Sequence, residues 1–200
     1  MSEPGGPDPA TLAVYDRDAP AYAAWSTARS PRDWLARFMA RLPAGGSALD
    51  LGCGAGWAAA EMIAAGFAVR ALDASEGLVK QARKSGVPAE KCAFADLKDV
   101  ETYDGVWASY SLLHAPRAEM GGHLARIRCA LKPGGTLYLG LKRGEGEARD
   151  TLGRLYVYWS EAAIRAELAA AGLVVDTLAT ARSTGWDGAE ETMMDLFARA

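Results

Sequence analysis

The chain has 200 residues, of which 50% are hydrophobic and 24% are charged, and its formal net charge at pH 7 is −3. This length and this balance favour one globular domain with a substantial core. The acidic net charge, without a dense patch of lysine and arginine, argues against nucleic acid as the main partner. No apolar run approaches the ~20 residues that cross a bilayer, so we expect no membrane partner.

The first residues are rich in glycine and proline and lack the basic and apolar segments of a signal peptide. We therefore predict a disordered tail over residues 1–12 and a single domain over residues 13–200. The three cysteines, Cys53, Cys92 and Cys129, lack the spacing of a metal-binding pattern. They favour reduced thiols in a cytoplasmic protein without a metal site.

A helical segment is predicted first, between Tyr15 and Leu42, because apolar residues recur there on one helical face. Ser30 is expected to cap a helix whose first residue is Pro31. The Pro-Ala-Gly-Gly segment at residues 43–46 ends this helix. Residues 13–45 therefore form an N-terminal helical segment that precedes the first strand.

A strand at residues 47–53 comes next, and it leads through a glycine-rich turn into a helix at residues 56–65. The turn reads Asp50-x-Gly52-x-Gly54-x-Gly56. Its glycines permit backbone conformations closed to other residues and the close approach of a ligand, and a helix start attracts anionic groups. A dinucleotide-binding loop requires glycine where this chain has Trp57, which disfavours a nicotinamide-dependent oxidoreductase.

Strands and helices then alternate along the chain. Strands are predicted at residues 68–73, 91–96, 103–111 and 136–141, and helices at residues 75–85, 117–131 and 160–172. Two strands without a helix between them close the chain, at residues 173–181 and about 192–199. The alternation predicts a parallel sheet with helices on both faces, in which a ligand binds at the carboxyl ends of the strands.

The glycine-rich turn and three later sequence features together resemble the class I S-adenosylmethionine (SAM) methyltransferases. The later features are the acidic residues at the ends of the second and third strands, Asp73 and Asp96, and the segment Leu131-Lys-Pro-Gly-Gly-Thr-Leu137. The resemblance runs from about Trp34 to Gly172. It implies an α/β, Rossmann-like, seven-stranded sheet of order 3-2-1-4-5-7-6 with the last strand antiparallel and helices on both faces.

The resemblance also implies SAM as the cofactor and S-adenosylhomocysteine (SAH) as its product. Asp73 suits the two ribose hydroxyls, and Asp96 is expected to accept from the adenine amino group. Asp50 either holds the loop or contacts the methionine amino group. Cys53 is expected to pack in the loop rather than to act as a nucleophile. The residues expected at the cofactor are Asp50, Gly52, Cys53, Gly54, Gly56, Asp73, Ala74, Ala95, Asp96, Leu97 and Ser111.

Candidate residues for the acceptor surround this set. His114 follows the fourth strand and is expected at the rim of the site, as a base, as an orienting donor, or as an ordinary loop histidine. His123 is expected on the surface. In the resembling enzymes an N-terminal segment folds over SAM, so Tyr22 suits a lid as well as an anchor to the core. The candidate acceptor-binding residues are Tyr15, Lys142 and Arg154, of which the last two also suit a solvated charged loop.

These inferences favour a SAM-dependent methyltransferase that passes a methyl group to a small-molecule acceptor by in-line displacement. Such a reaction requires that donor and acceptor are held in line and that water is excluded. The alternative is a non-catalytic SAM-sensing or partner-binding module with the same fold. The identity of the acceptor and the choice between monomer and homodimer stay open.

Overall fold

The computed structural model describes residues 6–200, and the first five residues of the predicted tail lie outside the described residues. Helix α1 (Pro9–Ala28) begins inside that predicted tail, so residues 9–12 are helical rather than disordered. Asp8 caps the helix, because its carboxylate accepts the backbone N–H of Thr11 at 2.8 Å. The same carboxylate pairs with Arg149 at 2.8 Å, and this pairing lowers the pKa of Asp8. The cap and the ion pair order the start of α1.

The helical segment predicted from Tyr15 to Leu42 is two helices, α1 and α2 (Arg32–Met39). The prediction that Ser30 caps the second helix is wrong, because α2 begins after Pro31 without a side-chain cap. The Ser30 hydroxyl instead donates to the carbonyls of Ser26 at 3.0 Å and Thr27 at 2.9 Å. It therefore satisfies carbonyls at the end of α1, a local bond that competes with capping.

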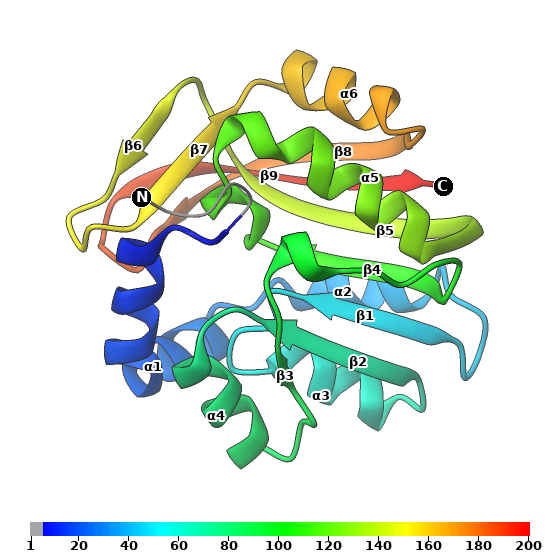
Figure 1. Cartoon of the computed structure of the whole chain (residues 1–200), viewed down its shortest axis with the longest axis horizontal. Coiled ribbons are helices and arrows are strands. Elements are labelled where there is room, and N and C mark those ends of the chain that lie inside the picture. The colour runs from blue at the N-terminus through cyan, green and yellow to red at the C-terminus, as the bar shows by residue number, and fades with distance from the viewer. Residues whose placement is uncertain (1–5) are drawn as a thin grey trace.

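The sheet has the predicted order (Figure 1). Its strands run β3, β2, β1, β4, β5, β9 and β8 from one edge, and β9 is antiparallel to both of its neighbours. The strands are β1 (Ser47–Leu51), β2 (Ala68–Asp73), β3 (Glu90–Lys91), β4 (Tyr103–Ser109), β5 (Leu131–Arg143), β8 (Val174–Thr184) and β9 (Glu190–Arg199). The remaining helices are α3 (Trp57–Ala64), α4 (Glu76–Lys84), α5 (Met120–Ala130) and α6 (Glu161–Ala170).

The third strand is shorter than predicted. We expected it over residues 91–96, but β3 ends at Lys91 and a 3-10 turn, η1 (Phe94–Asp96), follows. The reason is its neighbour: Lys91 pairs with Asp73, the last residue of β2. Cys92 makes the last of these contacts, donating its N–H to the Asp73 carbonyl at 2.9 Å, and the chain then leaves the sheet because β2 has ended.

A hairpin that the sequence did not reveal occupies the charged segment after β5. Its strands are β6 (Glu147–Arg149) and β7 (Leu155–Trp159), which pair antiparallel. β7 also pairs parallel with Lys142 and Arg143 at the end of β5. The hairpin lies beside the start of α1 (Figure 1).

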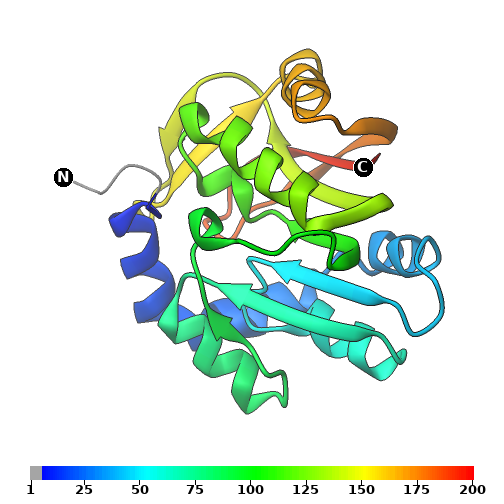
Figure 2. The same cartoon turned by 45° about the vertical axis from the view of Figure 1, so that its right-hand side comes forward.

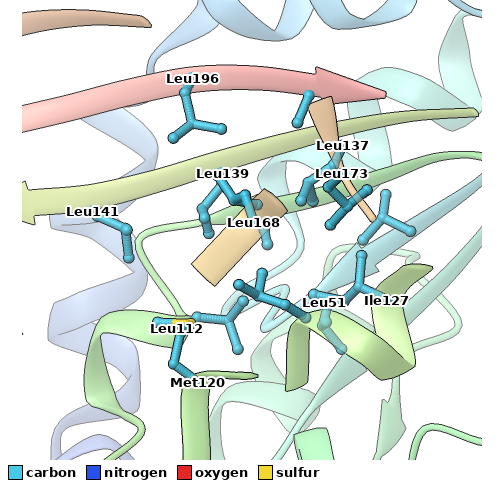
Figure 3. Packing of buried hydrophobic residues seen from close by; sticks show 14 of the residues in the cluster. Leu51, Leu112, Met120, Ile127, Leu137, Leu139, Leu141, Leu168, Leu173 and Leu196 are labelled. Carbon is cyan, nitrogen blue, oxygen red and sulfur yellow. The ribbon is translucent and has the colours of Figure 1, made fainter. Parts of the chain in front are cut away.

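Helices cover both faces of the sheet, because alternate residues of its central strands face opposite sides. Leu139 of β5 packs with Leu168 of α6 on one face (Figure 3). Trp107 of β4 and Tyr138 of β5 face the other side, where they stack with ring centroids 3.7 Å apart. Phe38 of α2 packs against this pair. Among the described residues, no helix is both long enough and apolar enough to cross a membrane.

Helix α1 lies across the edge at which the parallel strands end (Figures 1 and 2). Its Asp16 fixes it there, since one carboxylate oxygen accepts the Ser75 hydroxyl at 2.6 Å and the Gly77 N–H at 2.9 Å. Both donors belong to the start of α4. This docking holds the aromatic residues of α1 over the carboxyl ends of the strands.

Candidate functional site

The glycine-rich turn forms a tight backbone loop between β1 and α3. Gly52, Gly54 and Gly56 have φ values of +77°, +55° and +82°, a region that favours glycine. The N–H groups of Gly52 and Cys53 both donate to the Leu72 carbonyl, at 2.8 and 2.9 Å. The loop is therefore tied to β2, and a Cβ atom on Gly52 would lie only 2.2 Å from the Cβ of Ser111.

Asp73, at the end of β2, connects this loop to the start of α4. One of its carboxylate oxygens accepts the Gly54 N–H and the other accepts the Ser75 N–H, each at 2.8 Å. Burial raises the pKa of Asp73 to about 6, so the carboxylate is ionised at neutral pH. Each oxygen keeps capacity for a further donor.

A first cavity opens at the carboxyl ends of β1, β2 and β4. Its empty space measures about 750 Å³, open mouth included. Five of the predicted cofactor residues line it: Gly52, Gly54, Asp73, Ala74 and Ser111. Other residues at its wall come from α1, α4, η1, α5 and the segment after β4, and they include Tyr15, Tyr22, Leu78, Phe94, His114 and His123.

Three predicted residues near the loop lie behind this wall. Asp50 is 2% exposed and accepts the Ala59 N–H of α3 at 3.1 Å, the geometry of the loop-holding alternative. Cys53 is buried among small apolar side chains. Gly56 faces α4, where a Cβ atom would lie 3.0 Å from Ala82. These residues shape the loop without lining the cavity.

Relative to the wild-type chain at the same pH, Asp50→Asn is expected to raise the melting temperature more at about pH 9 than at about pH 6. Burial raises the pKa of Asp50 from the ordinary value of 3.8 to about 8. Between these values the native state holds the protonated form while the unfolded chain is ionised, so wild-type stability falls as pH rises through this window. Asparagine is neutral throughout and keeps an oxygen for Ala59. Melting temperatures of the ligand-free proteins test this, and a pH-independent difference would contradict it.

The third-strand residues, Ala95, Asp96 and Leu97, do not line the first cavity either. Because β3 is short, the chain turns at η1, which leaves Asp96 exposed and buries Leu97 in the core. Phe94 and His123 line the wall instead. The expectation that His123 lies on the surface is wrong: it is 4% exposed on α5 and meets the Phe94 ring edge-on at 5.5 Å.

A second cavity of about 1170 Å³, open mouth included, adjoins the first. The two share a wall made of Tyr15, Tyr22, Ser109, Tyr110 and His114. Trp186, in the turn between β8 and β9, closes over this wall and stacks on Tyr15 with centroids 6.5 Å apart. Sequence reasoning missed Trp186 because the turn between β8 and β9 carries no recognisable motif, although residues 181–185 also line the second cavity.

His114 sits in this wall with both ring nitrogens engaged. Nδ1 donates to the Leu155 carbonyl, so Nε2 carries no proton and accepts from the Tyr15 hydroxyl at 2.8 Å. Arg154 in turn donates to the Tyr15 oxygen at 3.0 Å. Burial lowers the pKa of His114 to about 3, so the ring is neutral at physiological pH. The ring therefore connects β7, through the Leu155 carbonyl, to α1, through the Tyr15 hydroxyl.

Lys142 and Arg154 are buried rather than part of a solvated charged loop. Arg154 is 1% exposed and pairs with Asp150 at 2.6 Å. Lys142 is 4% exposed, pairs with Glu191 at 3.1 Å and lies 3.4 Å from the centre of the Tyr156 ring. Both line the second cavity, and the β6–β7 hairpin that the sequence did not reveal explains their burial.

The methyltransferase domain family matches residues 48–135, which run from β1 into β5 and include the glycine-rich turn. This match covers less than half of the chain. One relative of this domain is the S-adenosyl-L-methionine-dependent Diels-Alderase iccD of Talaromyces variabilis, with 36% identity over 117 residues. The match covers 53% of this chain and 38% of the relative, so the chain spans about two fifths of that protein's length.

Solved structures share the fold of the methyltransferase domain and its flanking elements. The 1,6-didemethyltoxoflavin-N1-methyltransferase of Burkholderia thailandensis, solved with 1,6-didemethyltoxoflavin and SAH bound, superposes with a TM-score of 0.69. It is 23% identical, over 94% of this chain and 87% of that one. The (4+2)-cyclase SpnF gives a TM-score of 0.72 at 19% identity, over 98% of each chain. The fold is therefore that of SAM-dependent methyltransferases.

Proposed function

We propose that this chain is a SAM-dependent methyltransferase that transfers a methyl group to a small-molecule acceptor. The observation that carries the proposal is the pair of adjoining cavities with a common wall. The first cavity contains the glycine loop and Asp73, and the second contains aromatic and charged side chains. Two ligands bound in them meet at the wall, which is the arrangement that an in-line displacement requires.

The residues of the first cavity fit SAM. Asp73 is an ionised acceptor for the ribose hydroxyls, and it is held in place by two backbone N–H groups. Gly54 leaves the loop backbone open, because a Cβ atom there would meet only Tyr22, at 3.8 Å. Leu78 and Phe94 offer apolar surface to an adenine ring. SAM supplies the activated methyl group, and the chain has to hold it and exclude water.

The shared wall suits positioning. Tyr15 and Tyr22 are packed edge to face at 4.9 Å, and Trp186 covers both. The neutral His114 and the buried Arg154 fix the Tyr15 hydroxyl between them. Tyr22 then acts as a lid over Gly54, while His114 orients the wall. A proton from the acceptor reaches His114 Nε2 only when Tyr15 gives up its bond to that nitrogen.

Isothermal titration of the purified chain with SAH, with NADH as the control ligand, tests the cofactor half of the proposal. We expect micromolar binding of SAH and none of NADH. The transfer half is tested with SAM that carries a deuterated methyl group and 1,6-didemethyltoxoflavin as the first acceptor of a panel. Labelled product supports methyl transfer, and SAH binding without any labelled product favours the sensing module.

A second candidate is a SAM-dependent cyclase that binds SAM without transferring its methyl group. Two observations favour it: the 36% identity to a Diels-Alderase and the overlap with the cyclase SpnF along almost the whole chain. The same labelled cofactor separates the two candidates. A cyclase requires SAM or SAH for turnover of a linear polyene substrate but leaves the deuterated methyl group on the cofactor.

A further inference from the structure

Asp195 is a buried carboxylate in the second cavity that sequence reasoning did not single out. It lies on β9, between the buried residues Met194 and Leu196, and is 5% exposed. No lysine, arginine or histidine pairs with it among residues 6–200. Its hydrogen-bond donors are the hydroxyls of Tyr110, at 2.7 Å, and Tyr138. A carboxylate buried without a cation is costly, so its retention calls for a physical reason.

The two tyrosines occupy only one side of this carboxylate. Both donate to Oδ1, and among the described residues Oδ2 has no protein donor. Asp195 lines the second cavity, whereas Tyr138 belongs to the core beneath it. Burial raises the pKa of Asp195, and the two hydroxyls lower it in part. The tyrosines therefore hold the carboxylate in place and leave one oxygen for a ligand.

Backbone geometry brings Asp195 to the acceptor side of the shared wall. Ser109, Gly140 and Asp195 are in register across β4, β5 and β9, and therefore point to the same face. Gly140 has no side chain, and the Tyr110 ring lies over it, 3.3 Å from where a Cβ atom would be. Tyr110 adopts a φ of +53°, which is strained for a non-glycine residue. In this conformation its hydroxyl hydrogen-bonds to Asp195.

The second cavity, which Asp195 lines, has about 1170 Å³ of empty space, open mouth included. Aromatic side chains surround the same space: Tyr22, Trp25, Trp34, Trp57, Tyr156 and Trp186. Such walls favour stacking with planar, conjugated ligands.

We propose that the acceptor is a planar aromatic or heteroaromatic molecule with a ring N–H or O–H group, and that Asp195 Oδ2 accepts the hydrogen bond from that group. The inference rests on the proposed function, since it places this ligand beside bound SAM. It adds a specificity-determining residue that acts at the far end of the ligand from the cofactor. Tyr110 and Tyr138 are positioning residues for Asp195.

A matched pair of probes tests the hydrogen bond: lumazine, which carries two ring N–H groups, and 1,3-dimethyllumazine, in which both are methylated. Each is titrated into the wild-type chain saturated with SAH. We expect lumazine to bind at least tenfold more tightly than its dimethyl analogue. In Asp195→Asn, which presents an N–H donor on one side, we expect lumazine to lose about tenfold in affinity while the dimethyl analogue keeps its affinity.

Asp176→Asn is the control variant, because Asp176 lies on β8 in an exposed ion pair with Arg199. It should leave both affinities unchanged. The wild-type chain alone can overturn the proposal. It does so if it binds the two probes equally or if it binds neither. SAH affinity separates this failure from that of the proposed function: SAH binding without discrimination between the probes overturns only the role of Asp195, whereas loss of SAH binding overturns both.

Discussion

Asp73→Ala is expected to weaken SAH binding at least a hundredfold. Hydrogen bonds to a charged partner contribute about 1.5–3 kcal/mol each, and two ribose hydroxyls share this carboxylate in the proposed complex. Their loss removes about 3 kcal/mol or more, and every 1.4 kcal/mol is a tenfold change in affinity. The alanine also releases the N–H groups of Gly54 and Ser75, which loosens the glycine loop. Isothermal titration with SAH measures the effect.

The pH dependence of binding separates a direct role of Asp73 from a general loss of structure. The pKa of Asp73 lies at about 6, and only its ionised form accepts from both hydroxyls. Wild-type affinity for SAH should therefore fall as pH drops below about 6, whereas that of Asp73→Ala should not. Asp176→Ala, at an exposed position on β8, is the control. Unchanged affinity in Asp73→Ala would remove the ribose assignment.

The parts of the fold that the sequence predicted are those in which local pattern and topology agree. The order of the seven main strands followed from the alternation of strands and helices and from the resemblance. The same patterns placed Gly52, Gly54 and Asp73 at one cavity, since a glycine turn and a strand-end acid carry their own local signal. The predicted length of β3 was wrong because the strand can extend only as far as β2 runs beside it, and the residues of β3 do not encode where β2 ends.

The acceptor side depends on contacts between distant segments. Tyr15 meets His114 across 99 residues and Arg154 across 139 residues, and no local pattern predicts such a triad. One signal was available for Asp195. It is the only charged residue in the run Met193-Met194-Asp195-Leu196-Phe197, and a lone carboxylate in an apolar strand is a candidate for a buried polar role. Of the two tyrosines that hold it, Tyr138 lies on β5 and Tyr110 directly follows β4, and neither had such a signal.

Gly52→Ala is expected to remove SAH binding and to destabilise the chain by several kcal/mol. An alanine at a φ of +77° costs about 1–2 kcal/mol, and overpacking adds about 1–3 kcal/mol. The overpacking is severe here, because the new Cβ would lie 2.2 Å from the Cβ of Ser111. Ser111 cannot easily move, since its hydroxyl donates to the Leu51 carbonyl at 2.7 Å. Thermal melting and titration with SAH measure the two effects.

Gly66→Ala is the matched control, because Gly66 has a φ of +90° and no atom within 4 Å of the site of a Cβ. It should cost only the about 1–2 kcal/mol of backbone strain and leave SAH binding intact. Gly52→Ala combined with Ser111→Gly removes the clash of the two Cβ atoms and should recover part of the lost stability. If the two single glycine variants lose the same stability, the close approach of Gly52 to Ser111 does not determine the loop. A larger loss in Gly52→Ala, partly restored in the double variant, shows that contact between the glycine-rich turn and the segment after β4 shapes the floor of the first cavity.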